Sequence, residues 1–274
     1  MKRLSKDELY DLYWNKGLST CEIAKTYNIG ESTVKLWMSE YDIKRRSLSE
    51  ARKLHFKKVI DREIREKFSK PSPELAYILG VLLGDGTCYH RKHTGRREGV
   101  SYEIQLGVTD YLFAEKFKRA LEGLGLKTSI WILRRRCGRK DVYKVTSYSK
   151  AFYEFYRSLS LKDIRKFIVG FEPYFVCGFY ESEGCITYNK ARKQLVIQIS
   201  NTNYEVIKAI YDIIIDKFGI KCHLYKAKTT LGEKIEYRVV IQGDERCKRF
   251  LEIINPVIKN RPKNVNEEKR WLKR

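Results

Sequence analysis

The sequence predicts an α+β protein in which one αββαββα unit occurs twice, after a small all-α domain at the N-terminus. Three observations lead to this fold class. Several sequence blocks recur in the same order about one domain length apart. Each copy places alternating apolar and polar residues after an apolar helix, as in strands with one covered face. The first 46 residues show helical spacing alone, with capping signals and a tight turn.

The composition points to a nucleic-acid partner. The 274 residues include 56 Lys and Arg against 34 Asp and Glu, which gives a formal net charge of +22. A surplus of this size repels itself unless a polyanion is bound. No apolar stretch reaches the roughly 20 residues that cross a bilayer, and the start lacks the apolar core of a signal peptide. We therefore expect no membrane partner, and an intracellular protein that is either cytoplasmic, at a prokaryotic nucleoid, or organellar.

The first residues carry the features of a helix-turn-helix. Ser19 and Glu22 have the spacing of a capping box, and a further helix is expected after Gly30 with Val34, Trp37 and Met38 facing inward. Residues 18–47 resemble the helix-turn-helix of many microbial DNA-binding proteins, which implies that the start of the last helix meets base edges. The candidates for base contacts are Ser32, Thr33 and Lys35. The alternative is a small helical bundle that contacts only protein.

Breaks in composition divide the chain. A charged, helix-prone stretch follows the helix-turn-helix and is ended by Pro71 and Pro73. The predicted parts are a DNA-binding domain at 1–46, a basic helical linker at 47–70, and two repeats at 71–169 and 170–274.

The two repeats are visible by self-comparison. YILGVLLGDGT at 77–87 resembles FVCGFYESEGC at 175–185, and three further pairs of blocks follow in the same order. The offset is 98 residues for the first pair and 93 or 94 for the others, because the intervening loop is longer in the first copy. Each copy predicts an apolar helix, a hairpin, an amphipathic helix, a second hairpin and a terminal helix, related by a pseudo-twofold axis.

The repeated helix predicts a pair of acids at one place. Small residues let two helix backbones approach closely, and they recur on this helix at Ala76, Gly80, Gly84, Gly178 and Ser182. If the copies cross along this face, Asp85 and Glu183 meet at the helix C-termini. Carboxylates are disfavoured there and repel one another, and a divalent cation would reverse both penalties.

The chemistry that fits two such acids is metal-assisted hydrolysis of a phosphodiester. Mg²⁺ is often held by one or two carboxylates together with phosphate oxygens and water, and Mn²⁺ is the alternative metal. The competing interpretation is a pair of core helices whose acids act only as caps. It is disfavoured because acids cap helix N-termini rather than C-termini.

YILGVLLGDG and FVCGFYESEG resemble the two motifs of single-chain LAGLIDADG homing endonucleases, over roughly residues 71–264. The resemblance implies that Asp85 and Glu183 bind the catalytic metal, with Gly84 and Ser182 as further metal-binding positions. It also implies a monomer whose two sheets form a saddle in the major groove of double-stranded DNA. The earlier acidic position of the motif is Leu83 in one copy and Glu181 in the other.

The resemblance implies supporting residues as well. A polar residue is expected near the metal at the end of the first hairpin. Asn201 matches it in the second copy, whereas the first copy has Val108 or Gly107, so one half-site is expected to be weaker. A basic residue from the last helix of each repeat is expected to help organise the water network. The candidates are Lys162 or Lys166 in one repeat, and Lys263 or Arg261 in the other.

The open sheet faces offer side chains that suit DNA. Arg and Gln pair bidentately with guanine and adenine, and Lys and Arg at hairpin tips suit phosphates. The candidates are Gln105, Arg134, Arg136, Lys144, Arg192, Gln194, Gln198, Lys226, Lys228, Arg238 and Gln242. For any single residue the alternative is a solvated polar surface.

These features predict a site-specific double-strand DNA endonuclease that is encoded by a mobile intron and cuts a long site with short 3′ overhangs, as the family does. The chain lacks the C-terminal His-Asn of an intein, which favours a free-standing enzyme. The alternative is another role on the same scaffold, either an RNA maturase that binds intron RNA or a non-catalytic DNA-binding regulator. Both acids are retained, which argues against the degenerate regulator but leaves the maturase open.

Overall fold

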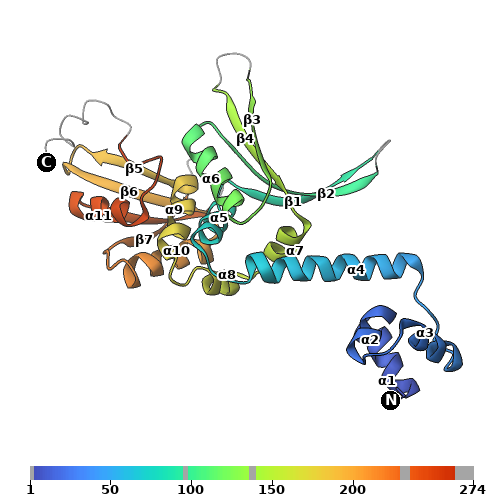
Figure 1. Cartoon of the computed structure of the whole chain (residues 1–274). Helices are drawn as coiled ribbons and strands as arrows, with labels where there is room; N and C mark the ends of the chain where they lie inside the picture. Colours follow the sequence, from blue (N-terminus) through green and yellow to red (C-terminus); the bar gives the residue numbers. More distant parts are fainter. Residues whose placement is uncertain (1–2, 95–97, 136–139, 229–234, 263–274) are drawn as a thin grey trace. The chain divides into compact units, whose positions relative to one another are not determined.

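The computed structural model describes residues 3–94, 98–135, 140–228 and 235–262. The chain divides into two compact units, Met1–Arg62 and Glu63–Arg274 (Figure 1). Most of the stretch predicted as a linker belongs to a helix that runs to the end of the first unit. None of the helices in the described ranges has the length and apolar character that crossing a bilayer requires.

The first unit is all helical. Its elements are α1 (Lys6–Tyr10), the π-helical turn η1 (Asp11–Asn15), α2 (Thr20–Thr26), α3 (Glu31–Glu40) and α4 (Leu48–Glu63). The predicted capping box begins α2, because the Ser19 hydroxyl accepts from the Glu22 amide at 3.1 Å and the Glu22 carboxylate accepts from the Ser19 amide at 2.7 Å. Asn28, with a φ of 52°, turns the chain between α2 and α3.

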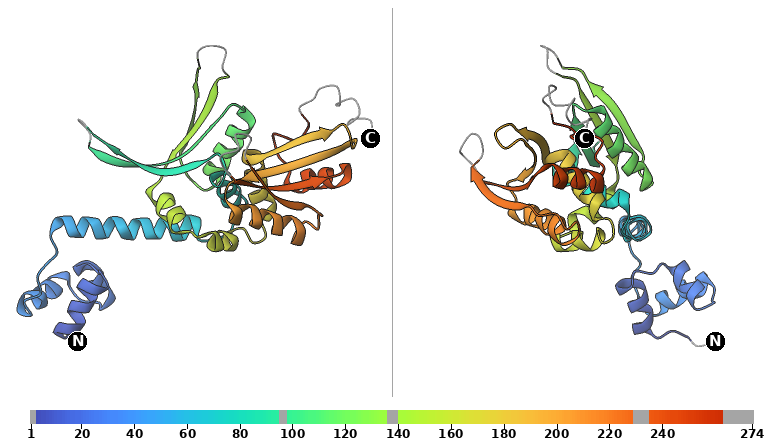
Figure 2. Two further views of the ribbon diagram at one scale, coloured as in Figure 1. Left: turned by 180° about the vertical axis from the view of Figure 1, so that it is seen from behind. Right: turned by 90° about the vertical axis from the view of Figure 1, so that its left-hand side faces the viewer.

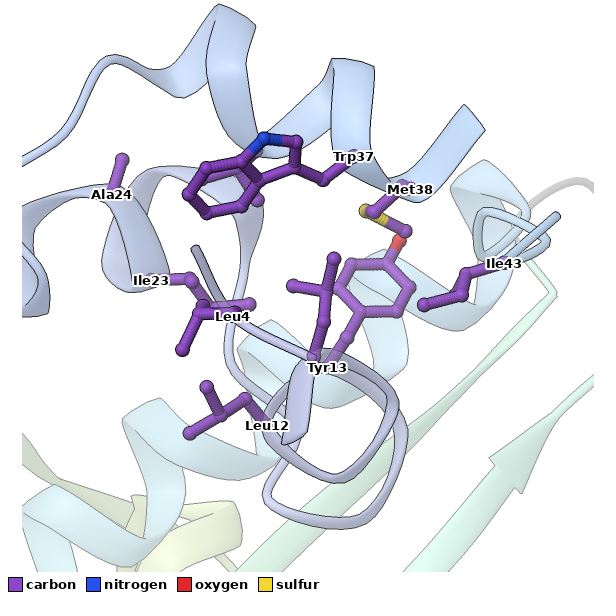
Figure 3. Close-up of a cluster of buried hydrophobic side chains, with 10 residues drawn as sticks. Leu4, Leu12, Tyr13, Ile23, Ala24, Trp37, Met38 and Ile43 are labelled. Carbon is purple, nitrogen blue, oxygen red and sulfur yellow. The ribbon is translucent and has the colours of Figure 1, made fainter. Parts of the chain in front are cut away.

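The core of the first unit lies between α1, α2 and α3 (Figure 3). Val34, Trp37 and Met38 of α3 are buried, as the helical spacing predicts. The labelled side chains of this cluster are Leu4, Leu12, Tyr13, Ile23, Ala24, Trp37, Met38 and Ile43. The helix-turn-helix therefore has an apolar core of its own, and the start of α3 remains at the surface.

The second unit contains the αββαββα pattern twice, which confirms the predicted fold class. The unit opens with the π-helical turn η2 (Ile64–Phe68). The first copy consists of α5 (Pro73–Leu82), β1 (Thr87–His93), β2 (Gly99–Val108), α6 (Tyr111–Gly123), β3 (Thr128–Leu133), β4 (Val142–Tyr148), α7 (Lys150–Ser158) and α8 (Leu161–Phe167). The second consists of α9 (Glu172–Glu183), β5 (Gly184–Asn189), β6 (Gln194–Asn201), α10 (Tyr204–Asp216), β7 (His223–Lys228), β8 (Ile235–Gln242) and α11 (Asp244–Ile254). The first copy thus ends in two helices, where one was expected.

Each copy forms a four-stranded antiparallel sheet, with strand orders β1-β2-β4-β3 and β5-β6-β8-β7. Helices cover one face of each sheet, and the strand residues on that face, such as Ile104, Ile197 and Ile241, are fully buried. The helices α5 and α9 lie together between the two sheets (Figures 1 and 2). This arrangement brings the C-terminal ends of both repeated helices to the middle of the unit.

Candidate functional site

The site begins where α5 and α9 cross with their backbones in contact. A Cβ atom on Gly80 would lie 2.2 Å from the Phe175 carbonyl oxygen, and one on Gly178 would lie 2.3 Å from the Tyr77 carbonyl oxygen. Tyr77 and Phe175 occupy the same position in the two copies, so the contact is pseudo-symmetric. A residue larger than glycine would force the helices apart, and the small residues of the sequence serve the close approach that they predict.

This crossing brings the two predicted acids together. Near the helix ends, a Cβ atom on Gly84 would lie 2.4 Å from the Ser182 Cβ and 3.1 Å from the Glu183 Cγ. Asp85 follows in the turn after α5, and Glu183 is the last residue of α9. The ends of the two helices are therefore adjacent, with one carboxylate on each.

The surroundings of the acids oppose their ionisation. Burial raises the pKa of Asp85 above its ordinary value, and the Lys259 ammonium partly offsets this. Burial also raises the pKa of Glu183, and the negative charge of Asp85 raises it further. A hydrogen bond from Asn201 and the Lys259 charge act in the opposite direction. Two carboxylates that repel each other in a partly buried place form a site that favours a cation.

Lys259 is the basic residue that the structure places at the acids. Its Nζ donates to the Ser182 carbonyl oxygen at 2.7 Å, and its own carbonyl oxygen accepts from the Tyr180 hydroxyl at 2.7 Å. Lys259 has a φ of 57°, a left-handed conformation that costs free energy in a residue other than glycine. The segment after α11 is thus held in a strained turn that directs this ammonium to the site.

Sequence reasoning missed Lys259, although it selected neighbours in the same basic run. Arg261 lines the cleft beside Asp85, and Lys263 lies outside the described residues. In the first repeat, Lys162 and Lys166 are exposed on α8, and Lys166 pairs with Asp163 at 2.8 Å rather than with either acid. The basic run after the last helix indicated that a cation serves the acids. Which of its side chains lies at the acids depends on the turn that follows α11.

Glu181 is a second feature that the motif alone did not explain. Its side chain is 0% exposed and forms an ion pair with Lys116 of α6 at 3.0 Å. It also accepts hydrogen bonds from the Tyr77 hydroxyl at 2.6 Å and from the Val257 backbone amide at 2.6 Å. The carboxylate therefore connects the first repeat to the segment that carries Lys259.

A cleft of about 760 Å³ opens beside Asp85, between the end of β2 and the start of β5. Its lining includes Glu181 and three cations, Lys140, Lys259 and Arg261. Acids with cations around them suit a phosphate group, because the carboxylates can share a metal with phosphate oxygens while the cations neutralise the remaining charge. Within the described ranges, no group of three or more His, Cys, Asp and Glu side chains could hold a metal alone.

The strand register places several predicted DNA contacts on the uncovered sheet faces. Residues directly opposite in an antiparallel pair share a face, and so do alternate residues of one strand. Lys144 lies opposite Gly107, two residues after Gln105, so Gln105 and Lys144 share the uncovered face of the first sheet. On the second sheet the residues that share the uncovered face are Gln194, Gln198, Arg238 and Gln242. Arg192 lies just before β6 and donates to the Gln242 side chain at 3.4 Å.

Other predicted contacts lie elsewhere. Lys226 and Lys228 are exposed on β7, but the register gives them the helix-covered face of the second sheet, together with Tyr237 and Asn201. Arg134 follows the end of β3, and Arg136 lies outside the described residues. On α3, Ser32 is exposed, Thr33 is half-buried, and Lys35 pairs with Glu31 at 2.8 Å.

Glu103 is buried although it lies on the uncovered face of the first sheet. It alternates with covered residues and yet is only 4% exposed. Its carboxylate accepts from the Tyr89 hydroxyl at 2.9 Å and from the Ser101 hydroxyl at 2.6 Å, and Gln105 also donates to it. The first sheet thus holds a buried acid that orders the polar side chains around it.

Comparison with known proteins finds two matching segments in the chain. A family model described as LAGLIDADG-like domain matches residues 72–160 and again 171–255. In Methanocaldococcus jannaschii, Uncharacterized protein MJ0314 is 37% identical over 163 residues, which is 58% of this chain and 59% of that protein. Uncharacterized protein MJ0398 is 33% identical over 141 residues, which is 51% of this chain and 49% of that protein. The chain therefore spans less than two thirds of the length of these curated relatives.

Solved structures are similar as well. The homing endonuclease I-DmoI in complex with DNA and Mn has 24% sequence identity and a TM-score of 0.47, and the match covers 66% of this chain and 96% of that chain. The N-terminal LAGLIDADG domain of DUF199/WhiA has 16% identity and a TM-score of 0.47, and the match covers 83% of this chain and 98% of that chain.

Proposed function

The chain belongs to the family of LAGLIDADG-like domains, and we propose that it is a site-specific DNA endonuclease that hydrolyses both strands with a divalent metal. One observation carries the proposal. The two repeats bring Asp85 and Glu183 together at the helix crossing, where burial raises the pKa of each and the charge of Asp85 raises that of Glu183 further. A fold that only binds DNA does not need two adjacent acids, because their repulsion lowers the stability of the protein until a cation is bound.

The donor set fits Mg²⁺ or Mn²⁺. Hard cations of this kind take oxygen ligands and keep several waters when the protein supplies only one or two carboxylates. Asp85 and Glu183 would provide those carboxylates. The carbonyl oxygen of Ser182 accepts from Lys259, and a carbonyl oxygen has a second lone pair that can take a ligand. The Gly84 carbonyl is its counterpart in the first repeat. When bound, the metal would lower the pKa of a coordinated water and stabilise the leaving oxygen.

The protein's own groups prepare the reaction. Asn201 orients the Glu183 carboxylate, Lys259 offers an ammonium near both acids, and Arg261 and Lys140 line the cleft where a phosphate would enter. The uncovered sheet faces, with Gln105, Lys144 and the residues that share the face of Gln198, would contact a long duplex. The net charge of +22 provides the attraction to the DNA backbone. A duplex bound by one chain would make the enzyme a monomer.

The test begins with finding a target. The full chain would be incubated with Mg²⁺ or Mn²⁺ and a plasmid library with randomised inserts, and linearised plasmids would be recovered and sequenced. On the recovered site, Asp85→Asn should slow cleavage at least about 10³-fold, because several kcal/mol of transition-state stabilisation are lost. The measurement is a cleavage time course together with a binding titration in Ca²⁺, in which affinity should persist and should fall steeply with salt.

A matched control removes a similar charge elsewhere. Asp216 is exposed at the end of α10, so Asp216→Asn should cut at the wild-type rate. An Asp85→Asn protein that cuts as fast as the wild type would rule out the assigned role of Asp85. A wild-type protein that binds DNA or intron RNA tightly and cuts no member of the library would instead favour a binding protein, such as a maturase or a regulator.

A further inference from the structure

A buried carboxylate lies on the face of the first sheet that the helices leave uncovered. Glu103 is only 4% exposed and lies opposite Tyr89 of β1 and Tyr148 of β4. Burial raises the pKa of Glu103, but hydrogen bonds from Ser101 and Tyr89 and nearby positive charges outweigh this effect, so the pKa lies below its ordinary value. Under the proposed function this ionised acid lies on a surface that approaches the negative DNA backbone, so contact with phosphate is not its role.

The Glu103 carboxylate is surrounded by donors. Among the described residues, three side chains donate to it, and all three belong to the hairpin of β1 and β2. The Ser101 hydroxyl donates to Oε1 at 2.6 Å, the Tyr89 hydroxyl donates to Oε2 at 2.9 Å, and the Gln105 amide nitrogen donates to Oε2. A buried carboxylate that accepts this many hydrogen bonds holds its donors in fixed orientations.

Two of these donors extend the network to the surface. A hydroxyl has one hydrogen, so Ser101 and Tyr89, which direct theirs at Glu103, act as acceptors toward their other neighbours. The Arg91 guanidinium donates to the Tyr89 hydroxyl at 3.2 Å, and His93 Nε2 lies 2.8 Å from the Ser101 hydroxyl. Arg91 and His93 are exposed, so the network begins at a buried acid and ends in groups that a ligand can reach.

The ends of this network follow an order along the hairpin. Gln105 lies opposite Thr87, which is two residues after Asp85 in the chain. Arg91 is four residues farther along β1 and on the same face, because alternate residues of a strand share a face. Gln105 therefore lies nearer to the paired acids than Arg91 does.

The second sheet has a different residue at the equivalent place. Val196 is the counterpart of Glu103, at the offset of 93 residues that relates the two hairpins. It lies opposite Thr187, whereas Glu103 lies opposite Tyr89. A valine side chain accepts no hydrogen bond. The fold therefore does not require a carboxylate at this position, and the network is particular to the first sheet.

The two side chains ordered by Glu103 suit different bases. Gln105 gives one N–H to Glu103 and keeps its carbonyl oxygen and second N–H, which match N6 and N7 of adenine in the major groove. Arg91 gives one N–H to Tyr89 and keeps others for O6 and N7 of guanine. Side chains that are ordered before binding avoid the entropic cost of being ordered in the complex.

We propose that Glu103 is a specificity-determining positioning residue, which orders Gln105 to read adenine and, through Tyr89, orders Arg91 to read guanine. Both bases lie in the half of the target that the first sheet contacts, and the adenine lies nearer to the cleavage position. This inference rests on the DNA-binding part of the proposed function and does not depend on cleavage. Glu103 itself reads no base, because it is buried and both of its oxygens accept from the protein.

Selection by binding tests this role without any need for cleavage. The full chain would be incubated in Ca²⁺ with a library of randomised duplexes, and the bound duplexes would be recovered and sequenced over several rounds. The wild type should select an A·T pair and a G·C pair in the same half-site. Glu103→Gln should lose about 10-fold in preference at each of these two pairs, because a single amide oxygen cannot hold all three donors.

Two further variants separate the branches of the network. Gln105→Ala should lose preference at the A·T pair alone, and Tyr89→Phe should lose preference at the G·C pair alone, each by about 10-fold. Both leave Glu103 with two of its three donors, so they test the network even if Glu103→Gln does not fold. Titration with duplexes that carry single base-pair changes measures each loss. A purely structural role of Glu103 would instead lower the affinity for all sequences alike.

Glu98→Gln is the matched control for charge. Glu98 is exposed just before β2 and takes no part in the hydrogen bonds to Glu103 described above. Its substitution removes the same charge from the same hairpin, so it should raise the affinity for all duplexes slightly and leave the base preference unchanged. A difference between Glu98→Gln and Glu103→Gln then measures the network rather than the net charge.

The outcomes distinguish this inference from the proposed endonuclease. A Glu103→Gln protein that selects the same bases as strongly as the wild type overturns the positioning role. A target in which the pair that depends on Gln105 is not A·T overturns the assignment of adenine. A wild type that selects a sequence with the expected dependence on Glu103, and cuts it in neither Mg²⁺ nor Mn²⁺, supports the positioning role and removes the endonuclease.

Discussion

The ends of the two crossing helices differ most in polarity at Leu83 and its counterpart Glu181, although the repeats share their topology. Leu83 after α5 is apolar, whereas its counterpart Glu181 in α9 is a fully buried carboxylate. Glu181 takes its partners from the other repeat, through Tyr77 and Lys116, and from the segment after α11, through the Val257 amide. Leu83 is thus apolar, whereas Glu181 also binds the segment that carries Lys259.

The difference extends to the space around each position. Leu83 lines a cleft of about 420 Å³ together with Tyr156 and Arg157 of α7. Glu181 lines the larger cleft beside Asp85, where the chain after α11 approaches the acids. A pseudo-symmetric fold can therefore keep the same sheet topology in both copies while one buried charge makes the site asymmetric.

Replacing Glu181 by leucine, the residue type of its counterpart Leu83, should have the largest effect on stability. Glu181→Leu leaves the Lys116 ammonium, the Tyr77 hydroxyl and the Val257 amide without an acceptor. Removing one partner of a buried ion pair costs about 3 kcal/mol or more. The Lys116 side chain is 26% exposed, which favours the lower end because the ammonium can turn to water. Chemical unfolding, with hydrogen exchange of α9 amides as the local probe, measures the loss.

The double variant tests whether the loss comes from the orphaned groups. Glu181→Leu combined with Lys116→Met should recover about half of the lost stability, because two apolar groups replace the pair. Glu181→Gln keeps the shape and should cost less than Glu181→Leu. If the double variant is as unstable as the sum of two independent changes, the ion pair is not the reason for the buried carboxylate.

Both helices of the crossing should be destabilised to a similar extent when the glycine at the contact is enlarged. Gly178→Ala and Gly80→Ala each place a methyl group against a backbone carbonyl of the other helix, and overpacking of this kind costs about 1–3 kcal/mol. Thermal unfolding of the full chain measures both. Gly99→Ala is the matched control, since nothing lies within 4 Å of its new methyl group. Losses that differ several-fold between the two arms would mean that the contact is not symmetric.

The smallest expected effect is a gain in stability from removing one acid. The pKa values of Asp85 and Glu183 are raised, so the folded protein holds protons more strongly than the unfolded chain. Stability therefore falls as pH rises above the ordinary pKa values of 3.8 and 4.5. Asp85→Asn should therefore stabilise the metal-free protein at neutral pH by about 0.5 kcal/mol, the size of a partly screened charge pair.

The pH dependence of that gain identifies its cause. It should vanish below about pH 4, where the carboxyl groups are protonated in the wild type as well. Added Mg²⁺ should stabilise the wild type and should have less effect on Asp85→Asn. Melting curves from pH 3 to pH 8, with and without Mg²⁺, measure both differences. A gain that is constant over this range would come from packing rather than from charge repulsion.

The sequence by itself determined the duplication, the αββαββα order apart from the second terminal helix of the first copy, the buried apolar positions of most strands, and the meeting of Asp85 with Glu183. These follow from local spacing, because apolar residues at helical or alternating intervals and small residues at i, i+4 act within one element. The internal repeat then relates one crossing helix to the other.

Only the tertiary structure decided which cation and which polar groups serve the acids. Glu181 is 104 residues from Tyr77 and 76 from Val257, and Lys259 is 77 residues from Ser182. The segment after α11, with Lys259 in a left-handed conformation, places the Lys259 ammonium on the Ser182 carbonyl oxygen. No periodicity encodes such contacts, because they arise from elements that meet only after both repeats have packed.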